Sequence, residues 1–476
     1  GAIVVTLNAA ADAGVNLTQL TGSAGITSIT AADSFTFTGT LHGSVATTVA
    51  DSVTFTTTAL KATGKTISDG DDTATVAITA LHSDLDADLS GIDANTVTAA
   101  FDDNGTFTGD LGTAVVTVAN DKTLTGAANK LVGHTINKVV DGNGAIVVTL
   151  NAAADAGVNL TTIGGTVDIT SITAADSFTF TGTLHAGTAT TVADSVTFTT
   201  TALKATGKSI IDAGADTATV AITALHSDLD ADLSGVATNT VTAAFDDNGT
   251  FTGDLGTAVV TVANDKTLTG AANKLVGHTI NKVVDGNGAI VVTLNAAADA
   301  GVNLTTIGGT VDITSITAAD SFTFTGTLHA GTATTVADSV TFTTTALKAT
   351  GKSIIDAGAD TATVAITALH SDLDADLSGV ATNTVTAAFD GDGTFTGDIG
   401  TAVVTVGDGN TLTATAEKVT GKTINDAGAD TATVAITALH STLNANLGSI
   451  STNTVTAAFD DNGTFTGDLG TAVVTV

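Results

Sequence analysis

Aspartate clusters at a recurring turn are the residues of this chain best suited to chemistry. The first copy is Asp102-Asp103-Asn104-Gly105, and Asp110 follows it closely. Calcium takes six to eight oxygen ligands in proteins, and a turn with two or three aspartates supplies half of them. The sequence therefore predicts a calcium site at this turn, with an ordinary Asn-Gly hairpin turn as the alternative. The predicted ligands in the four copies are Asp102, Asp103, Asn104 and Asp110; Asp246, Asp247, Asn248 and Asp254; Asp390, Asp392 and Asp398; Asp460, Asp461, Asn462 and Asp468.

A second acidic pattern, D-x-D-x-D, begins at Asp84 and recurs at Asp228 and Asp372. An EF-hand loop needs glycine at its sixth position and glutamate at its twelfth, where this chain has Leu89 and Asn95. The last copy replaces all three aspartates with Thr442, Asn444 and Asn446, so the fold tolerates the loss of the charges. Leucines recur every fourth residue across 80–91, which predicts a short amphipathic helix with the aspartates on its solvated face. The leucines are Leu81, Leu85 and Leu89.

The nine histidines and the remaining polar residues form no catalytic or zinc motif. Each histidine occupies a repeated position alone, and zinc needs three or four ligands at one point. A catalytic site needs a unique constellation of different groups, which near-identical copies do not contain. Glu417 is the single glutamate and has no evident partner. We therefore expect stacked structural or surface histidines, no enzymatic activity and no required cofactor; Ca²⁺ enters only as the hypothesis for the aspartate turns.

Composition excludes several classes of protein. The 476 residues include no Cys, Pro, Met, Trp or Tyr, and the formal net charge is −34. Disulfide frameworks and cysteine-based metal sites are therefore excluded. A chain this acidic repels phosphate, so we expect no nucleic-acid partner. Because no apolar run approaches 18 residues, we also expect no membrane-spanning helix.

The chain is a tandem array of two alternating module types. The segment GAIVVTLNAAADAGVNLT begins at Gly1 and returns at Gly144 and Gly288, and a G-[KH]-[TS]-I segment returns every 69–74 residues. Modules that carry TATVAITALHSDLDADLSG are type A, and modules that carry AIVVTLNAAADAGVNLT are type B. The predicted modules are 1–63 (partial B), 64–132 (A), 133–206 (B), 207–276 (A), 277–350 (B), 351–420 (A) and 421–476 (partial A). Because the chain opens and closes inside modules, we expect it to be a piece of a longer array.

Short strands fill each module. In residues 64–132 the β-rich runs are 73–79, 95–101, 106–109, 114–118 and 123–126, and they alternate Thr or Ser with apolar residues. The strongest runs are about twenty residues apart, so three coils fill a module of about seventy residues. This spacing predicts an all-β fold, a β-solenoid whose coils pair in register and stack threonines in ladders. A string of small β-sandwich modules is the alternative, although sandwiches usually take about 100 residues.

The alternating TATVAIT, DLDADLSG and NTVTAAF segments resemble the giant tandem-repeat surface proteins of bacteria. That resemblance covers the whole chain and implies an adhesin, a sheath or a surface coat that is exported from the cell. The calcium-binding nonapeptide of many such proteins, GGxGxDxLx, is absent. We therefore expect an extracellular structural protein that self-associates into a stiff filament, sheath, surface layer or stalk. The alternatives are an adhesive array that binds glycans, mineral or another surface, and a phage or secretion-system fibre.

Overall fold

The computed structural model describes residues 1–20, 25–71, 73–359 and 361–476 and shows an all-β solenoid. Strands account for 43% of the chain and helices for 9%, and the strands stack in about 22 turns. The prediction of a β-solenoid is confirmed, and separate β-sandwiches are not what the chain forms. Residues 21–24, 72 and 360, which belong to three of the predicted modules, lie outside the described residues.

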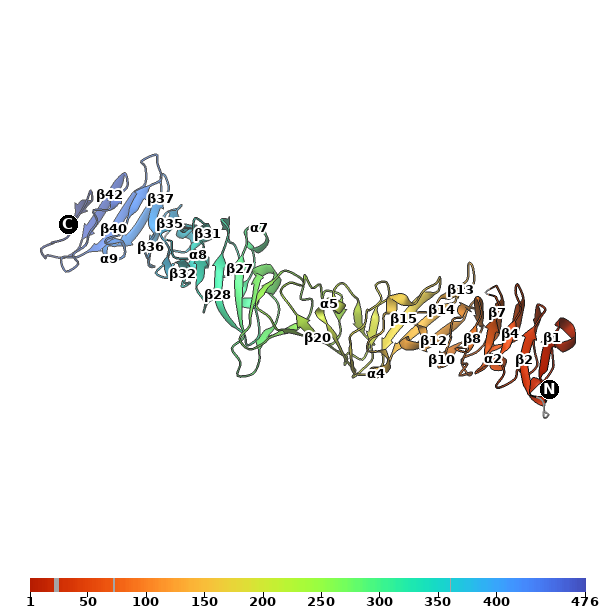
Figure 1. Ribbon diagram of the computed structural model, residues 1–476. Coiled ribbons are helices and arrows are strands. Elements are labelled where there is room, and N and C mark those ends of the chain that lie inside the picture. Colours follow the sequence, from red (N-terminus) through yellow and green to blue (C-terminus); the bar gives the residue numbers. More distant parts are fainter. Residues whose placement is uncertain (21–24, 72, 360) are drawn as a thin grey trace. The chain divides into compact units, whose positions relative to one another are not determined.

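The chain divides into two compact units. Unit 1 holds Gly1–Ala224 with Ala231–Ala243, and unit 2 holds Leu225–Asp230 with Ala244–Val476. In each unit the strands that neighbour one another in a sheet come from successive coils, as the colours of Figure 1 show. All the strand pairs described are parallel, which is the arrangement of a solenoid rather than of hairpins.

Unit 1 contains three complete sheets and part of a fourth. The first consists of β1 (Ile3–Leu7), β2 (Ile26–Ala31), β4 (Thr47–Val49), β6 (Ile67–Asp69) and β8 (Ile92–Asp93). The second consists of β3 (Phe35–Thr36), β5 (Thr54–Thr58), β7 (Thr75–Leu81), β9 (Thr96–Phe101), β11 (Val115–Val118) and β13 (Ile136–Lys138). The third consists of β10 (Gly105–Phe107), β12 (Thr123–Ala127), β14 (Ala145–Leu150), β15 (Asp168–Ala174), β17 (Thr190–Val192), β19 (Ile210–Asp212) and β21 (Val236–Ala237). Strands β16 (Phe178–Phe180), β18 (Thr197–Thr201) and β20 (Thr219–Leu225) begin the fourth, and the division between the units falls within β20 and β22 (Thr240–Phe245).

Unit 2 repeats this arrangement. It contains β24 (Val259–Val262) paired with β26 (Ile280–Lys282), and then three sheets. The first consists of β23 (Gly249–Phe251), β25 (Thr267–Ala271), β27 (Ala289–Leu294), β28 (Asp312–Ala318), β30 (Thr334–Val336), β32 (Ile354–Asp356) and β34 (Val380–Ala381). The second consists of β29 (Phe322–Thr323), β31 (Thr341–Thr345), β33 (Thr363–Thr367), β35 (Thr384–Phe389), β37 (Val403–Val406), β39 (Ile424–Asp426) and β41 (Ile450–Ser451). The third consists of β36 (Gly393–Phe395), β38 (Thr411–Thr415), β40 (Thr433–Leu439), β42 (Thr454–Phe459) and β43 (Val473–Thr475).

Single helical turns form corners of the coils, because Ala, Leu and Lys favour helix where the β-branched residues stop. The α-helices are α1 (Ala9–Asp12), α2 (Ala59–Ala62), α3 (Ala128–Leu131), α4 (Ala152–Asp155), α5 (Ala202–Ala205), α6 (Ala272–Leu275), α7 (Ala296–Asp299), α8 (Ala346–Ala349) and α9 (Ala416–Val419). The 3₁₀ turns are η1 (Leu17–Gln19), η2 (Leu160–Thr162), η3 (Leu304–Thr306) and η4 (Leu369–Ser371).

In-register pairing explains both the core and the threonine ladders. Phe55, Val76 and Val97 pair in successive coils and are all buried. One residue earlier, Thr54, Thr75 and Thr96 pair in the same way and face solvent to different degrees. A period-2 strand places such neighbours on opposite faces, so each coil adds one layer to an apolar core and one rung to a threonine ladder.

Two local predictions are wrong. Residues 80–91 form no helix: β7 runs to Leu81, and the rest is turn and extended chain with one bridge, Asp88 to Asp110. Leu85 is half-buried while Leu81 and Leu89 are buried, so the leucine spacing comes from a corner rather than from helical periodicity. The Asn104-Gly105 turn is also not a hairpin, because β9 and β10 on its two sides belong to different sheets.

Candidate functional site

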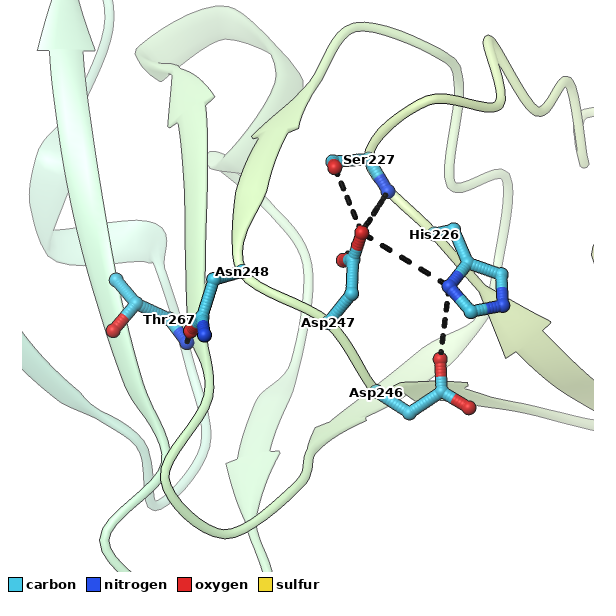
Figure 2. A network of polar contacts seen from close by, with 6 residues as sticks. All are labelled: His226, Ser227, Asp246, Asp247, Asn248 and Thr267. Atoms are coloured by element: carbon cyan, nitrogen blue, oxygen red, sulfur yellow. Dashed lines mark hydrogen bonds and ion pairs between the residues drawn. The ribbon is translucent and has the colours of Figure 1, made fainter.

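The best-defined polar network joins a corner of each type A module to the next coil, and Figure 2 shows the second copy, which begins at His226. The Asp247 carboxylate accepts hydrogen bonds from the Ser227 hydroxyl at 2.8 Å and from its backbone N–H at 3.2 Å. The His226 Nδ1 lies 3.4 Å from an oxygen of Asp246 and 3.9 Å from one of Asp247. His226 follows β20, whereas the two aspartates follow β22, so the network connects residues about twenty positions apart.

Every type A module carries a version of this network. In the first copy His82 Nδ1 lies 3.6 Å from Asp102, and the Ser83 hydroxyl donates to Asp103 at 2.6 Å. In the last copy His440 lies 2.9 Å from Asp460, and Ser441 donates to Asp461 at 2.7 Å. The third copy keeps the pair of His370 and Asp390 but has Gly391 at the position of Asp103. We call this set of contacts the His-Ser-Asp ladder.

Hydrogen bonding in the ladder favours the ionised carboxylates. The Ser83 hydroxyl, followed by the backbone N–H groups of Asn104 and Ser83, holds the pKa of Asp103 below its ordinary value. The Ser441 hydroxyl and the Gly463 N–H lower the pKa of Asp461 in the same way. Asp103 and Asp461 therefore stabilise the contact between coils in their charged form.

The residues predicted as calcium ligands in a turn do not converge on one point. Asn104 Oδ1 accepts a hydrogen bond from the Thr123 N–H at 2.8 Å, and Asp110 Oδ1 accepts one from the Gly112 N–H at 2.8 Å. Asp102 and Asp103 face His82 and Ser83 instead. Figure 2 shows this divergence for the second copy, where Asn248 points toward Thr267 and away from Asp247.

The other copies behave alike. Asp254, Asp398 and Asp468 each accept a hydrogen bond from the glycine N–H two residues later in their own turn. Asp392 accepts one from the Thr411 N–H at 2.6 Å and thus takes the role of Asn104. A calcium site at these turns stays a prediction.

The structure instead brings together residues that the sequence analysis treated separately. His82, Asp84 and Asp103 each offer one ligand atom, and these atoms lie within 4.8 Å of one another; His226, Asp228 and Asp247 repeat the group. One imidazole and two carboxylates are the protein groups in the described residues that could hold a metal ion. Their three donors are fewer than the oxygens that calcium requires.

The remaining D-x-D-x-D aspartates are bonded locally. The Thr108 hydroxyl donates to Asp86 in the adjacent coil, and the Ser90 hydroxyl and N–H donate to Asp88. The Ser90 hydroxyl is the main reason that the pKa of Asp88 is lowered, and Lys130 contributes. Asp84 and Asp86 are exposed, as expected for solvated residues, although they lie in a corner and not on a helix.

Histidines outside the ladder have structural positions. His42 Nδ1 accepts hydrogen bonds from the backbone N–H groups of Ser44 and Val45, at 3.3 and 3.1 Å, and so closes a corner. Burial lowers the pKa of His134 and of His278, which favours the neutral imidazole. These contacts agree with the structural role expected of single histidines.

Two sets of structural aspartates were missed by sequence reasoning. Asp212 accepts hydrogen bonds from the N–H groups of Gly214 and Ala218, at 3.1 Å each, and from Asn239 of the next coil at 3.3 Å. Asp155 is fully buried, and its carboxylate accepts from the N–H groups of Asn129 and Asn151 at 2.7 Å each. The exact repetition of Asp212 after GKSI was the available signal, but the partner that lies 27 residues away cannot be read from the sequence.

Comparison with known proteins identified no relative. No family model, curated protein or solved structure matches the chain. Within the described residues, no helix has the length and apolar character needed to cross a membrane.

Proposed function

We propose that this chain is an extracellular structural repeat protein that forms part of a filament, sheath, surface layer or stalk. The β-solenoid fold is compatible with a structural or an adhesive repeat protein. The observation that carries the structural proposal is that the ladders of hydrogen bonds, threonines and aspartates recur coil after coil within each unit. Repetition multiplies one stabilising contact along one direction, which suits a load-bearing element better than it suits a single binding site.

The proposal includes self-association into a polymer or layer. Parallel strands with unpaired edges are able to add a strand of another molecule. With a net charge of −34, association between copies depends on screening of charge by salt or cations. The proposal requires neither catalysis nor a cofactor.

Electron microscopy of the purified protein tests this proposal. We expect elongated rods at low salt and longer polymers or sheets at higher ionic strength. Round particles, or beads joined by flexible linkers, at every salt concentration would contradict a structural array.

An adhesive array is the second candidate, because threonine hydroxyls and aspartates are presented at regular intervals on the same solenoid. Binding of the purified protein to cell-surface glycans or mineral without formation of polymers would favour adhesion. A phage or secretion-system fibre is a third and weaker candidate, which would be favoured if the protein copurified with such a particle.

A further inference from the structure

Each unit has a corner cavity, and the two cavities are lined by corresponding residues. The cavity in unit 1 has a volume of about 270 Å³ and that in unit 2 about 360 Å³. In unit 1 three successive coils contribute to it: Thr106 from β10, Ala127 and Lys130 at β12 and α3, and Thr149 and Asn151 at β14 and α4. The corresponding residues in unit 2 are Thr250, Ala271, Lys274, Thr293 and Asn295.

In the part of the chain that the structure describes, most polar groups of these corner cavities have no protein partner; the exceptions are the Thr108 and Thr252 hydroxyls, which donate to Asp86 and Asp230. Among the described residues, the Thr106 and Thr149 hydroxyls, the Lys130 ammonium group and the Asn151 carboxamide form no hydrogen bond. Some threonine hydroxyls elsewhere in the solenoid do have a protein acceptor, as when the Thr57 hydroxyl donates to the Phe37 carbonyl at 3.1 Å. Lys130, Thr149 and Asn151 are half-buried, so donors and acceptors converge on a partly dry space without a protein partner.

Two residues form the apolar part of the lining. The Ala127 side chain and the buried ring of Phe107 lie beside these polar groups. A few polar groups over an apolar floor are typical of a small-molecule site, and the volume is near the lower end of the usual range of roughly 300 to 1,000 Å³. A pyranose ring has the matching character, since its C–H face is apolar and its rim carries hydroxyls. We propose that each corner cavity binds one uncharged sugar residue of a glycan.

Charge selects an uncharged sugar over an acidic one. Lys130 interacts with Asp88 and contributes to the lowered pKa of that carboxyl group. Asp86 and Asp110 line the adjoining hollow on the other side of Lys130. These carboxylates offset the ammonium charge, and the net charge of −34 repels anions. Lys130 therefore donates hydrogen bonds to sugar hydroxyls rather than pairing with a carboxylate.

A cavity at the opposite junction, where the type B module 1–63 meets the type A module 64–132, shows what the sugar site depends on. The cavity there, of about 320 Å³, has Leu60, His82 and Asp84 in its lining, so a leucine, an imidazole and a charged carboxylate replace the amide and ammonium groups. We expect sugar binding at the two cavities where a type A module meets the following type B module, and not at this one.

Saturation-transfer NMR titration of the full chain tests the proposal. The probes are the methyl glycosides of glucose, galactose and mannose, with methyl glucuronide as the charged counterpart of the first. We expect saturable binding of at least one neutral glycoside, with a Kd of the order of millimolar. Binding of the glucuronide should be at least about fivefold weaker, as about 1 kcal/mol of repulsion gives.

Matched variants locate the site. Asn151→Asp with Asn295→Asp keeps the size of both side chains, neither of which makes a capping hydrogen bond within the described residues, but replaces an amide with a charge, and it should reduce affinity at least fivefold. Lys130→Gln with Lys274→Gln should do the same, whereas Lys122→Gln, outside the cavity, should not. Equal melting temperatures verify the fold. Absence of saturable binding to all three neutral glycosides, undiminished binding by the Asn→Asp variant, or equal binding of the glucuronide would each overturn the proposal.

Discussion

Type A and type B modules build the same parallel ladder but connect their coils with different side chains. The last residue of a short strand differs between the module types: it is Asp212 in β19 of a type A module and Lys138 in β13 of a type B module. The Asp212 carboxylate accepts hydrogen bonds from three backbone N–H groups. Lys138 pairs with the exposed Asp168 at 2.7 Å. Type B modules compensate elsewhere, with the buried carboxylate of Asp155 between two coils.

The comparison shows that backbone pairing between strands and side-chain contacts at the corners contribute separately to the stability of the fold. Backbone pairing is common to both module types, so the choice of corner residues is free to diverge. An exposed ion pair contributes little, whereas a carboxylate that accepts several backbone N–H groups satisfies donors that would otherwise lack partners. The four predictions that follow separate these contributions.

The largest effect is expected from the core of type B modules. Phe180 and Phe198 are buried, their ring centroids lie 5.7 Å apart, and Phe178 packs against both. Phe180→Ala should lower the free energy of unfolding by about 3–5 kcal/mol. Phe101→Ala in a type A module, where no ring contact with Phe101 is found among the described residues, should cost about 1 kcal/mol less. Denaturant unfolding monitored by circular dichroism measures both, and equal losses would show that ring contacts add nothing.

The buried carboxylate of type B modules gives the next effect. Asp155→Ala leaves the part-buried N–H groups of Asn129 and Asn151 without an acceptor and should lower the free energy of unfolding by about 1–3 kcal/mol. Asp12→Ala is the matched control, because among the described residues the Asp12 carboxylate accepts hydrogen bonds only from Asn8 of its own coil. Chemical denaturation of the two variants should show a clearly larger loss for Asp155. If the two losses are equal, the contact between coils does not stabilise the fold.

Acid should weaken type A modules through their hydrogen-bonded aspartates. The Gly214 N–H, with those of Ala218 and Asn239, lowers the pKa of Asp212, and the Ser83 hydroxyl lowers that of Asp103. A carboxylate whose pKa is lower in the folded state stabilises the protein at pH values above its unfolded-state pKa. That stabilisation is lost as the pH falls through the folded-state pKa. The melting temperature should therefore hold down to about pH 5 and fall below about pH 4.

Asp212→Asn should remove part of that acid sensitivity and lower the melting temperature at neutral pH by several degrees. Lys138→Ala, at the same position of a type B module, should change it by much less, because its ion pair is exposed. Thermal scans across pH provide the measurement. An unchanged acid profile in Asp212→Asn would assign the acid transition to other groups.

The smallest effect concerns the residue that type A modules insert before the corner. Ala80 has φ of 52°, and Ala224, Ala368 and Ala438 share this left-handed conformation. Ala80→Gly should raise the free energy of unfolding by about 0.5–1 kcal/mol, because glycine adopts this conformation without Cβ strain. The matched control is Ala99→Gly in the buried strand β9, which should destabilise the protein instead. Loss of stability in both variants would mean that Ala80 is not strained.

Much of the fold could be predicted, and the candidate sites much less so. The runs at 95–101, 114–118 and 123–126 correspond closely to β9, β11 and β12, because strand periodicity is a local property. The helix predicted over 80–91 failed because its leucine spacing reflects a corner in which Leu81 and Leu89 reach the core from different coil positions. The calcium ligands were grouped by nearness in sequence, although Asp103 faces Ser83 and Asn104 faces Thr123, each about twenty residues away.

The strands, their spacing of about twenty residues and the repetition of the modules can be predicted from the amino-acid sequence alone. Those properties depend on the local conformational preference of the residues and on the repeat period, and both are directly visible in the sequence. Three features are visible only in the three-dimensional fold: His82 lies beside Asp102, Asp155 is buried between two coils, and three coils together leave a cavity beside Asn151. The physical reason is register: a side chain in one coil meets whatever the next coil places beside it, and a bulge of one residue, as at Ala80, changes that partner.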